Sequence, residues 1–221
     1  MVPFHPRFEE LPPDFAVFPL TGALMLPRGK LPLNIFEPRY LAMTLDSLAS
    51  RRMFGMIQPD AQMPQGENGP GLYKVGCLGR VSSFSETDDG RLLITLTGLV
   101  RFKVGRELEM CRGYRRVQAD FDGYRNDLVI PPPPFRLERE RIISALRPYF
   151  QSRQVNANWE AINGLSDDAL VITLAMACPF EPVEKQALLE APTEAERAET
   201  LLTLLQMGAA GPGVPPGHTI S

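Results

Sequence analysis

The sequence predicts an α+β protein in which a β-rich lobe is followed by a helical lobe. Apolar and polar residues alternate over residues 92–104, and residues 73–84 form a second clear strand pattern. Pro131–Pro134 cannot enter a helix interior or a central strand, and the apolar spacing after them becomes helical. The 221-residue chain is therefore expected to change from strands to helices at this proline run.

The same pattern divides the chain into four parts. Residues 1–14 are expected to form an extended arm punctuated by prolines, and residues 15–125 the β-rich lobe. Residues 135–207 are expected to form the helical lobe, and residues 208–221 a disordered Gly/Pro tail. The first residues carry prolines and acids where a secretory signal needs an apolar core, and no apolar run is long enough to span a membrane. We therefore expect a cytoplasmic protein with no membrane partner.

The β-rich lobe is expected to hold short strands joined by turns, with one helix. Gly90 follows two aspartates and gives a tight hairpin, and Gly98 inside the next strand indicates a bulge that bends it. Pro38 suits the first position of the helix. Residues 58–71 contain three Pro and three Gly, which is typical of a long loop. The expected strands are residues 16–20, 24–26, 31–36, 53–57, 73–84, 92–104 and 114–121.

The helical lobe is expected to begin with a helix that places Phe135, Ile142 and Tyr149 on one face. Pro148 should kink or end this helix because proline lacks the N–H of the helical hydrogen bond. Further helices are expected over residues 169–177, from Pro182 to Glu190, and after a capping box at Thr193–Glu196.

Several segments resemble, in order, the N-terminal substrate-recognition domain of Lon proteases. The first is Phe18-Pro19-Leu20, then Leu24-Met25-Leu26-Pro27, then residues 31–40, which read LPLNIFEPRY. Further matches are residues 56–58, 73–81, 89–102 and 184–190, so that the resemblance covers about residues 15–207. Thr21 stands where the proteases usually carry Arg.

This resemblance implies a PUA-like β pseudo-barrel followed by a helical bundle. It implies a free-standing, bacterial-type copy of the domain, without the ATPase and peptidase domains of the protease. The function implied is non-catalytic binding of unfolded or apolar polypeptide segments, as an adaptor or regulator in protein quality control. A separate protease is then an expected partner.

The residues themselves argue against catalysis and against a cofactor or metal. His5 and His218 are the two histidines, and both lie in the expected tails, where no rigid site would hold them. The sequence contains no GxxxxGK[ST] loop for phosphate. Cys77 and Cys178 are expected to be small buried apolar residues rather than nucleophiles.

Two candidate binding surfaces remain. Met63, Leu72 and Tyr73, in and after the long loop, are expected to form a patch for apolar peptides, because flexible Met side chains suit promiscuous recognition. The alternative is an RNA-binding surface in the basic segment 101–116, where Phe102 and Tyr114 are interleaved with cations. Its candidate residues are Arg101, Lys103, Arg106, Arg115 and Arg116. The net charge of −3 favours a solvated sheet face over nucleic-acid binding.

Overall fold

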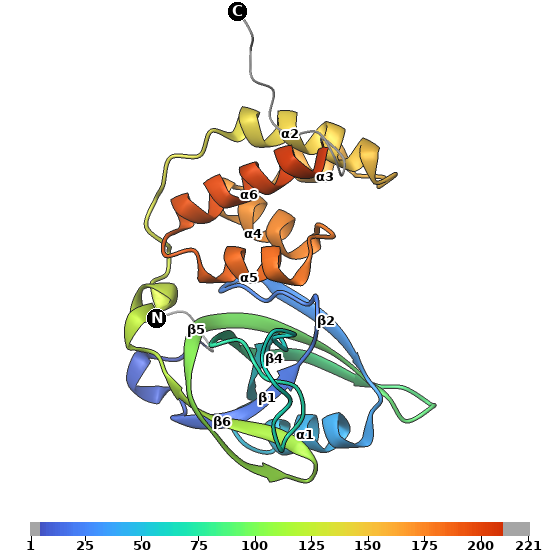
Figure 1. Cartoon of the computed structure of the whole chain (residues 1–221), viewed down its shortest axis with the longest axis vertical. Helices are drawn as coiled ribbons and strands as arrows, with labels where there is room; N and C mark the ends of the chain where they lie inside the picture. The colour runs from blue at the N-terminus through green and yellow to red at the C-terminus, as the bar shows by residue number, and fades with distance from the viewer. Residues whose placement is uncertain (1–4, 210–221) are drawn as a thin grey trace, which may run out of the picture.

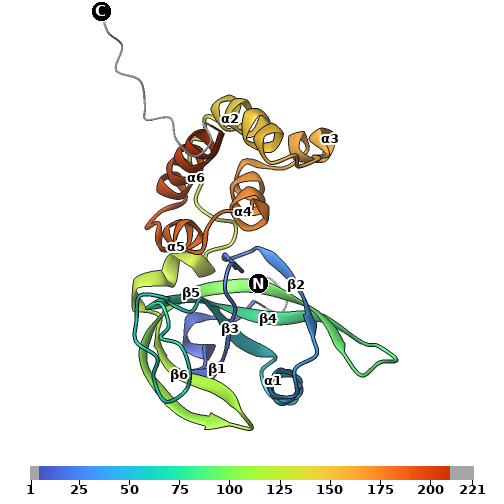
Figure 2. The ribbon, with the colours of Figure 1, turned by 45° about the vertical axis from the view of Figure 1, so that its right-hand side comes forward.

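The computed structural model describes residues 5–209 as two lobes, a strand-rich barrel lobe and a helical lobe stacked on it (Figure 1). This is the α+β architecture predicted from the sequence. One helix, α1 (Pro38–Leu48), belongs to the barrel lobe and lies against the side of the sheet away from the helical lobe (Figure 2). The strands are β1 (Asp14–Pro19), β2 (Lys30–Ile35), β3 (Met53–Ile57), β4 (Val75–Glu86), β5 (Leu92–Cys111) and β6 (Tyr114–Asp120).

Five of the six strands close into a ring. The sheet order is β2-β5-β4-β3-β1-β6, and β5 also pairs with β6, so β5 contributes to both ends of the ring. Its 20 residues make this double pairing possible. The bulge predicted at Gly98 is confirmed: Leu78 pairs with Val100 and Gly79 with Gly98, which leaves Leu99 as the extra residue. A Cβ on Gly98 would collide with the carbonyl oxygen of Leu26, so the bulge requires glycine.

The ring encloses an apolar core of its own. Phe102 lies at its centre, fully buried, and meets Phe15 edge to face with 4.9 Å between ring centroids. A second apolar cluster begins on the outer side of the sheet and continues into the helical lobe. Burial of apolar side chains therefore stabilises the junction of the two lobes as well as each lobe.

The helical lobe begins after the proline run. Its helices are α2 (Arg139–Ser152), α3 (Trp159–Asn163), α4 (Asp167–Ala177), α5 (Pro182–Glu190) and α6 (Glu194–Ala209). The predicted capping box is present: the Glu196 N–H donates to Thr193 Oγ1 over 3.2 Å, and the Thr193 N–H donates to the Glu196 carboxylate over 3.0 Å. Pro182 opens α5 as predicted.

Three expectations about individual strands and helices were wrong. Residues 24–26 are not a strand; Pro27 and the positive φ of Arg28 (66°) turn the backbone there, although the three side chains are buried. Helix α2 continues through Pro148 to Ser152, because Tyr149 and Phe150 beyond the proline pack in the core. Phe135 precedes α2 and is not part of it.

The expectations for the two tails also need correction. The arm contains a 3₁₀ helix over Phe8–Glu10 and a buried Leu11, so it is not simply extended. Gly208 and Ala209 belong to α6, where Gly208 packs closely against the Tyr149 ring. Residues 1–4 and 210–221, including His218, lie outside the described residues.

Candidate polypeptide-binding site

The sequence-predicted patch lies at a hollow of about 500 Å³ between loop 58–71 and the β5–β6 hairpin, here called the loop hollow. Met63, Leu72 and Tyr73 all line it, so the structure brings the three residues together. Met63 is 41% exposed, whereas Leu72 is 6% exposed and packs into the core of the ring. The patch therefore offers one exposed large apolar side chain, Met63.

Polar contacts hold the loop in place beside this hollow. Arg115 donates from Nη1 to the Pro70 carbonyl oxygen over 2.7 Å and forms an ion pair with Glu107. Asn68 donates to the same Glu107 carboxylate over 3.2 Å. Because much of the rim is charged or amide-bearing, the loop hollow is poorly suited to a purely apolar segment.

The residues of the RNA-binding alternative are not gathered on one surface. Arg101 and Arg115 are buried, and each is engaged in an ion pair. Arg116 pairs with Asp14, and Arg106 donates to Gln118, which leaves Lys103 as an exposed cation.

The two aromatic side chains of this segment are also buried. Phe102 lies inside the ring, and Tyr114 is buried with its hydroxyl donating to Asp46 over 2.9 Å. A base-stacking surface needs exposed ring faces, and neither ring provides one.

A groove that the sequence did not reveal lies between the lobes. This interlobe groove has a volume of about 630 Å³ and runs between residues 28–32 and one face of α4. Its lining is mainly apolar and includes Leu31, Pro32, Leu165, Ala169, Ile172 and Met176. Pockets that bind organic ligands have volumes in this range and are lined in the same way, with few polar groups.

Close packing at one point defines the end of the interlobe groove. Gly29 lies against Met176 and Ile172 so closely that a Cβ at this position would collide with the Met176 sulfur. Arg28 is fixed by its backbone N–H, which donates to the Gly98 carbonyl over 2.8 Å, and by an ion pair with Glu194 of α6. Both lobes therefore contribute walls, and their relative position sets the width of the groove.

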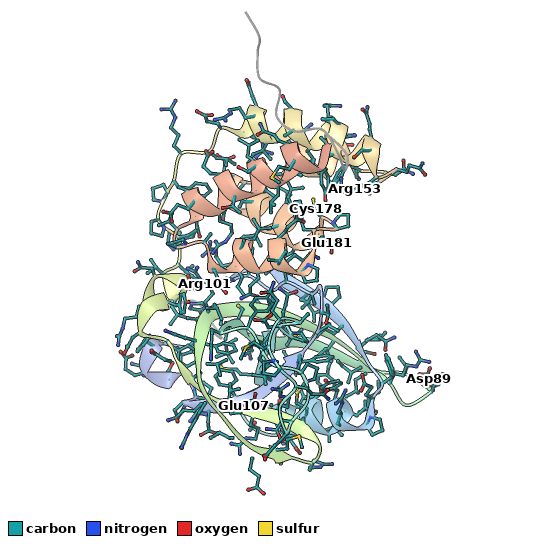
Figure 3. The ribbon with its side chains drawn as sticks, in the orientation of Figure 1. Asp89, Arg101, Glu107, Arg153, Cys178 and Glu181 are labelled. Atoms are coloured by element: carbon teal, nitrogen blue, oxygen red, sulfur yellow. The ribbon has the colours of Figure 1, made fainter. Side chains whose placement is uncertain are left out.

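Further hydrogen bonds fix that relative position. Lys185 of α5 donates to the Gly22 carbonyl over 2.7 Å, and Gln186 donates to the Val75 carbonyl over 3.1 Å. Arg101 donates to the Leu189 and Ala191 carbonyls at the end of α5, and Figure 3 labels it at the junction of the lobes.

Burial changes the acidity of two thiols and one amine among the described residues. Burial raises the pKa of the Cys178 thiol to about 12 and also raises that of Cys77, so both thiols are protonated at neutral pH. Burial lowers the pKa of Lys185, but no serine hydroxyl among the described residues is hydrogen-bonded to its amine.

The described part of the chain holds neither a metal-binding cluster nor a membrane-spanning helix. Over residues 5–209 no group of three or more His, Cys, Asp or Glu side chains is arranged to hold a metal ion. No helix in the same range is both long enough and apolar enough to cross a membrane.

Comparison with known proteins identifies the fold. The Lon N-terminal domain protein from Xanthomonas campestris is 23% identical with a TM-score of 0.57, and the match covers 86% of this chain and 97% of that chain. The N-terminal domain of Mycobacterium avium complex Lon protease is 16% identical with a TM-score of 0.57, covering 90% and 99%. These similarities confirm the predicted fold class.

Sequence comparison identifies the family. The Lon protease of Flavobacterium johnsoniae is 21% identical over 96 residues, which are 43% of this chain but 12% of that protein. The family model described as the ATP-dependent protease La (LON) substrate-binding domain matches residues 15–207, nearly the whole described chain. The chain therefore belongs to the family of the Lon substrate-binding domain.

Proposed function

We propose that this protein binds unfolded or apolar polypeptide segments without altering them chemically, and that the interlobe groove is the main binding site. The observation that carries the proposal is the apolar lining of this groove, built from Leu31 and Pro32 of one lobe and Ile172 and Met176 of the other. Transfer of an apolar side chain from water into the groove stabilises the complex by about 25 cal/mol per Å² of apolar surface buried.

The family supports polypeptides as the ligand class, since its description is that of a protease substrate-binding domain. We further propose that the protein acts in the cytoplasm as an adaptor or regulator in protein quality control, presenting bound clients to a separate protease. The loop hollow with Met63, Leu72 and Tyr73 is proposed as a secondary contact, because its rim is more polar than the groove.

The proposal is tested by fluorescence-anisotropy titration against a reduced, carboxymethylated polypeptide and a mixed RNA pool, each at two salt concentrations. Binding of the polypeptide should change little with salt, whereas RNA affinity falls steeply because bound counterions are released. Salt-sensitive RNA binding with no polypeptide signal would contradict the proposal.

A pair of variants locates the site. Met176→Lys places a charge in the interlobe groove. It is expected to weaken polypeptide binding about tenfold, which is a loss of roughly 1.4 kcal/mol of binding free energy. Met207→Lys is the matched control, because Met207 is 64% exposed on α6 and does not line the groove. Circular dichroism and the melting temperature establish that both variants are folded.

A further inference from the structure

Strand β2 has a free edge. It pairs with β5 alone and is the outermost strand in the sheet order. The Gly98 N–H donates to the Gly29 carbonyl over 2.8 Å. In an antiparallel ladder the backbone groups of alternate residues face the partner strand, so the N–H and C=O groups of Leu31, Leu33 and Ile35 point toward β5. The backbone groups of Lys30, Pro32 and Asn34 consequently point away from the sheet.

These outward groups have no partner among the described residues. Lys30, Pro32 and Asn34 are all exposed, and no described donor or acceptor is hydrogen-bonded to their backbone. Pro32 has no N–H, so the edge presents three carbonyl acceptors and the N–H donors of Lys30 and Asn34. An extended backbone is the ligand whose donors and acceptors match such a row.

Two hollows border β2 and share Pro32. The interlobe groove reaches Pro32 from the side of α4. A second hollow of about 500 Å³ lies over one face of the sheet, from Pro32 and Asn34 of β2 across Leu93 of β5 to Phe84 of β4, and Phe84 and Leu93 are 51% and 48% exposed. Figure 1 shows β2 running from the helical lobe toward the end of the sheet that carries the β4–β5 hairpin. An extended ligand of about six residues would span the roughly 20 Å length of β2.

We propose that the polypeptide binds as an added strand along the free edge of β2, with an apolar side chain entering the interlobe groove beside Pro32. This inference rests on the proposed function and specifies its binding mode: an extended segment, recognised partly through its backbone. Backbone recognition tolerates different sequences, because every residue except proline carries the same donor and acceptor.

The edge itself favours an unfolded segment over a second copy of the chain. Pairing of two β2 edges would place two prolines and two Lys30 side chains in one ladder. Each proline removes a donor, and Lys and Pro are residues that protect natural edges from pairing with each other. A client segment without proline meets Pro32 and Lys30 once instead of twice, so the penalty is smaller.

Two substitutions at one position test the role of the backbone. Asn34→Pro removes the outward N–H at an edge position where proline is tolerated, and Asn34→Ala keeps it. The probe is a fluorescein-labelled ten-residue peptide of alternating Leu and Thr. Asn34→Pro should bind the peptide about fivefold more weakly than Asn34→Ala, the effect of one lost hydrogen bond, because both variants lack the Asn side chain and differ in the backbone N–H.

A second measurement uses the unaltered protein and so does not depend on how the variant folds. Two isomers of the peptide carry backbone N-methyl groups on alternate residues, one along each edge of the extended chain. Strand addition requires that one isomer lose about tenfold or more in affinity while the other retains its binding.

The outcomes separate the binding mode from the proposed function. If the unmethylated peptide binds and Met176→Lys weakens it, but neither methylated isomer differs from the other, strand addition is wrong and the proposed function stands. If neither this peptide nor the carboxymethylated polypeptide binds, both are wrong.

Discussion

The guanidinium of Arg101 on β5 donates two parallel hydrogen bonds, each 2.9 Å long, to the two carboxylate oxygens of Asp127. Both side chains are buried, at 6% and 10% exposure. The same guanidinium donates to the Ala191 carbonyl over 2.6 Å. One residue of the barrel lobe thus connects the segment after β6 to the helical lobe.

We expect Asp127→Asn to lower the free energy of unfolding by about 3 kcal/mol, because it leaves the buried Arg101 charge without its counterion. Urea denaturation followed by circular dichroism measures this change. Asp122→Asn is the control: Asp122 pairs with Arg125 at the surface, and its loss should change stability by less than about 0.5 kcal/mol. If both variants lost the same free energy of unfolding, the buried Arg101–Asp127 pair would contribute no more to stability than the surface pair.

The bulge in β5 should be equally sensitive. Gly98→Ala is expected to lower the free energy of unfolding by about 2 kcal/mol, because the new Cβ would collide with the Leu26 backbone. Backbone atoms cannot move aside as a flexible side chain could. Gly123→Ala is the control, since nothing lies within 4 Å of the corresponding Cβ. A melting temperature that is unchanged by Gly98→Ala would contradict the close approach seen here.

Tyr149 is fully buried, and its hydroxyl has no hydrogen-bond partner among the described residues. Tyr149→Phe is therefore expected to raise stability by about 1 kcal/mol at pH 7, since it removes an unsatisfied polar group. Differential scanning calorimetry provides the comparison with the unaltered protein. A destabilised variant would reveal a partner for the hydroxyl.

The same residue should affect alkaline unfolding. Burial is the main cause that raises the pKa of Tyr149 to about 12, above the ordinary value of 10.0. Between about pH 10 and 12 the unfolded chain loses this proton first, so Tyr149 makes stability fall as pH rises. Tyr149→Phe should make the decline shallower, as measured by urea midpoints at pH 9 to 11.

Thiol labelling should distinguish the three cysteines. Cys77 and Cys178 are buried with raised pKa values, whereas Cys111 is partly exposed at the end of β5. At pH 8 a thiol-specific disulfide reagent is expected to label Cys111 alone, and all three sites after denaturation. Mass spectrometry of the labelled peptides identifies the sites, and rapid native labelling of Cys178 would show that the helical lobe opens.

The sequence predicts elements whose signals are local. Thr193 and Glu196 are three residues apart and cap each other, so their pattern is readable without a partner elsewhere in the chain. Pro148 misled the prediction because the packing of Tyr149 and Phe150 outweighs one missing helical hydrogen bond. Tertiary contacts of this kind leave no trace in a window of a few residues.

The candidate site depends almost entirely on such distant contacts. Gly29 and Met176 meet at the interlobe groove although 147 positions separate them, and neither residue type signals a binding site by itself. Arg101 alternates with apolar neighbours as a solvent-facing residue would, but its partner Asp127 lies 26 positions later. The one signal available was the apolar character of α4 on all sides, which exceeds what a helix with one buried face needs.

At the end of α5 the Leu189 and Ala191 carbonyls receive hydrogen bonds from Arg101, about 90 positions earlier in the chain, and the Leu188 carbonyl receives one from Arg197 of α6. A helix normally completes its C-terminus with groups close in sequence. Here part of that closure is supplied by a strand of the other lobe, so α5 reaches its final form only once the ring of strands exists. Folding is thus expected to be ordered in time, with the strands assembled first and the helices docking onto them, and the two lobes should melt in a single cooperative transition.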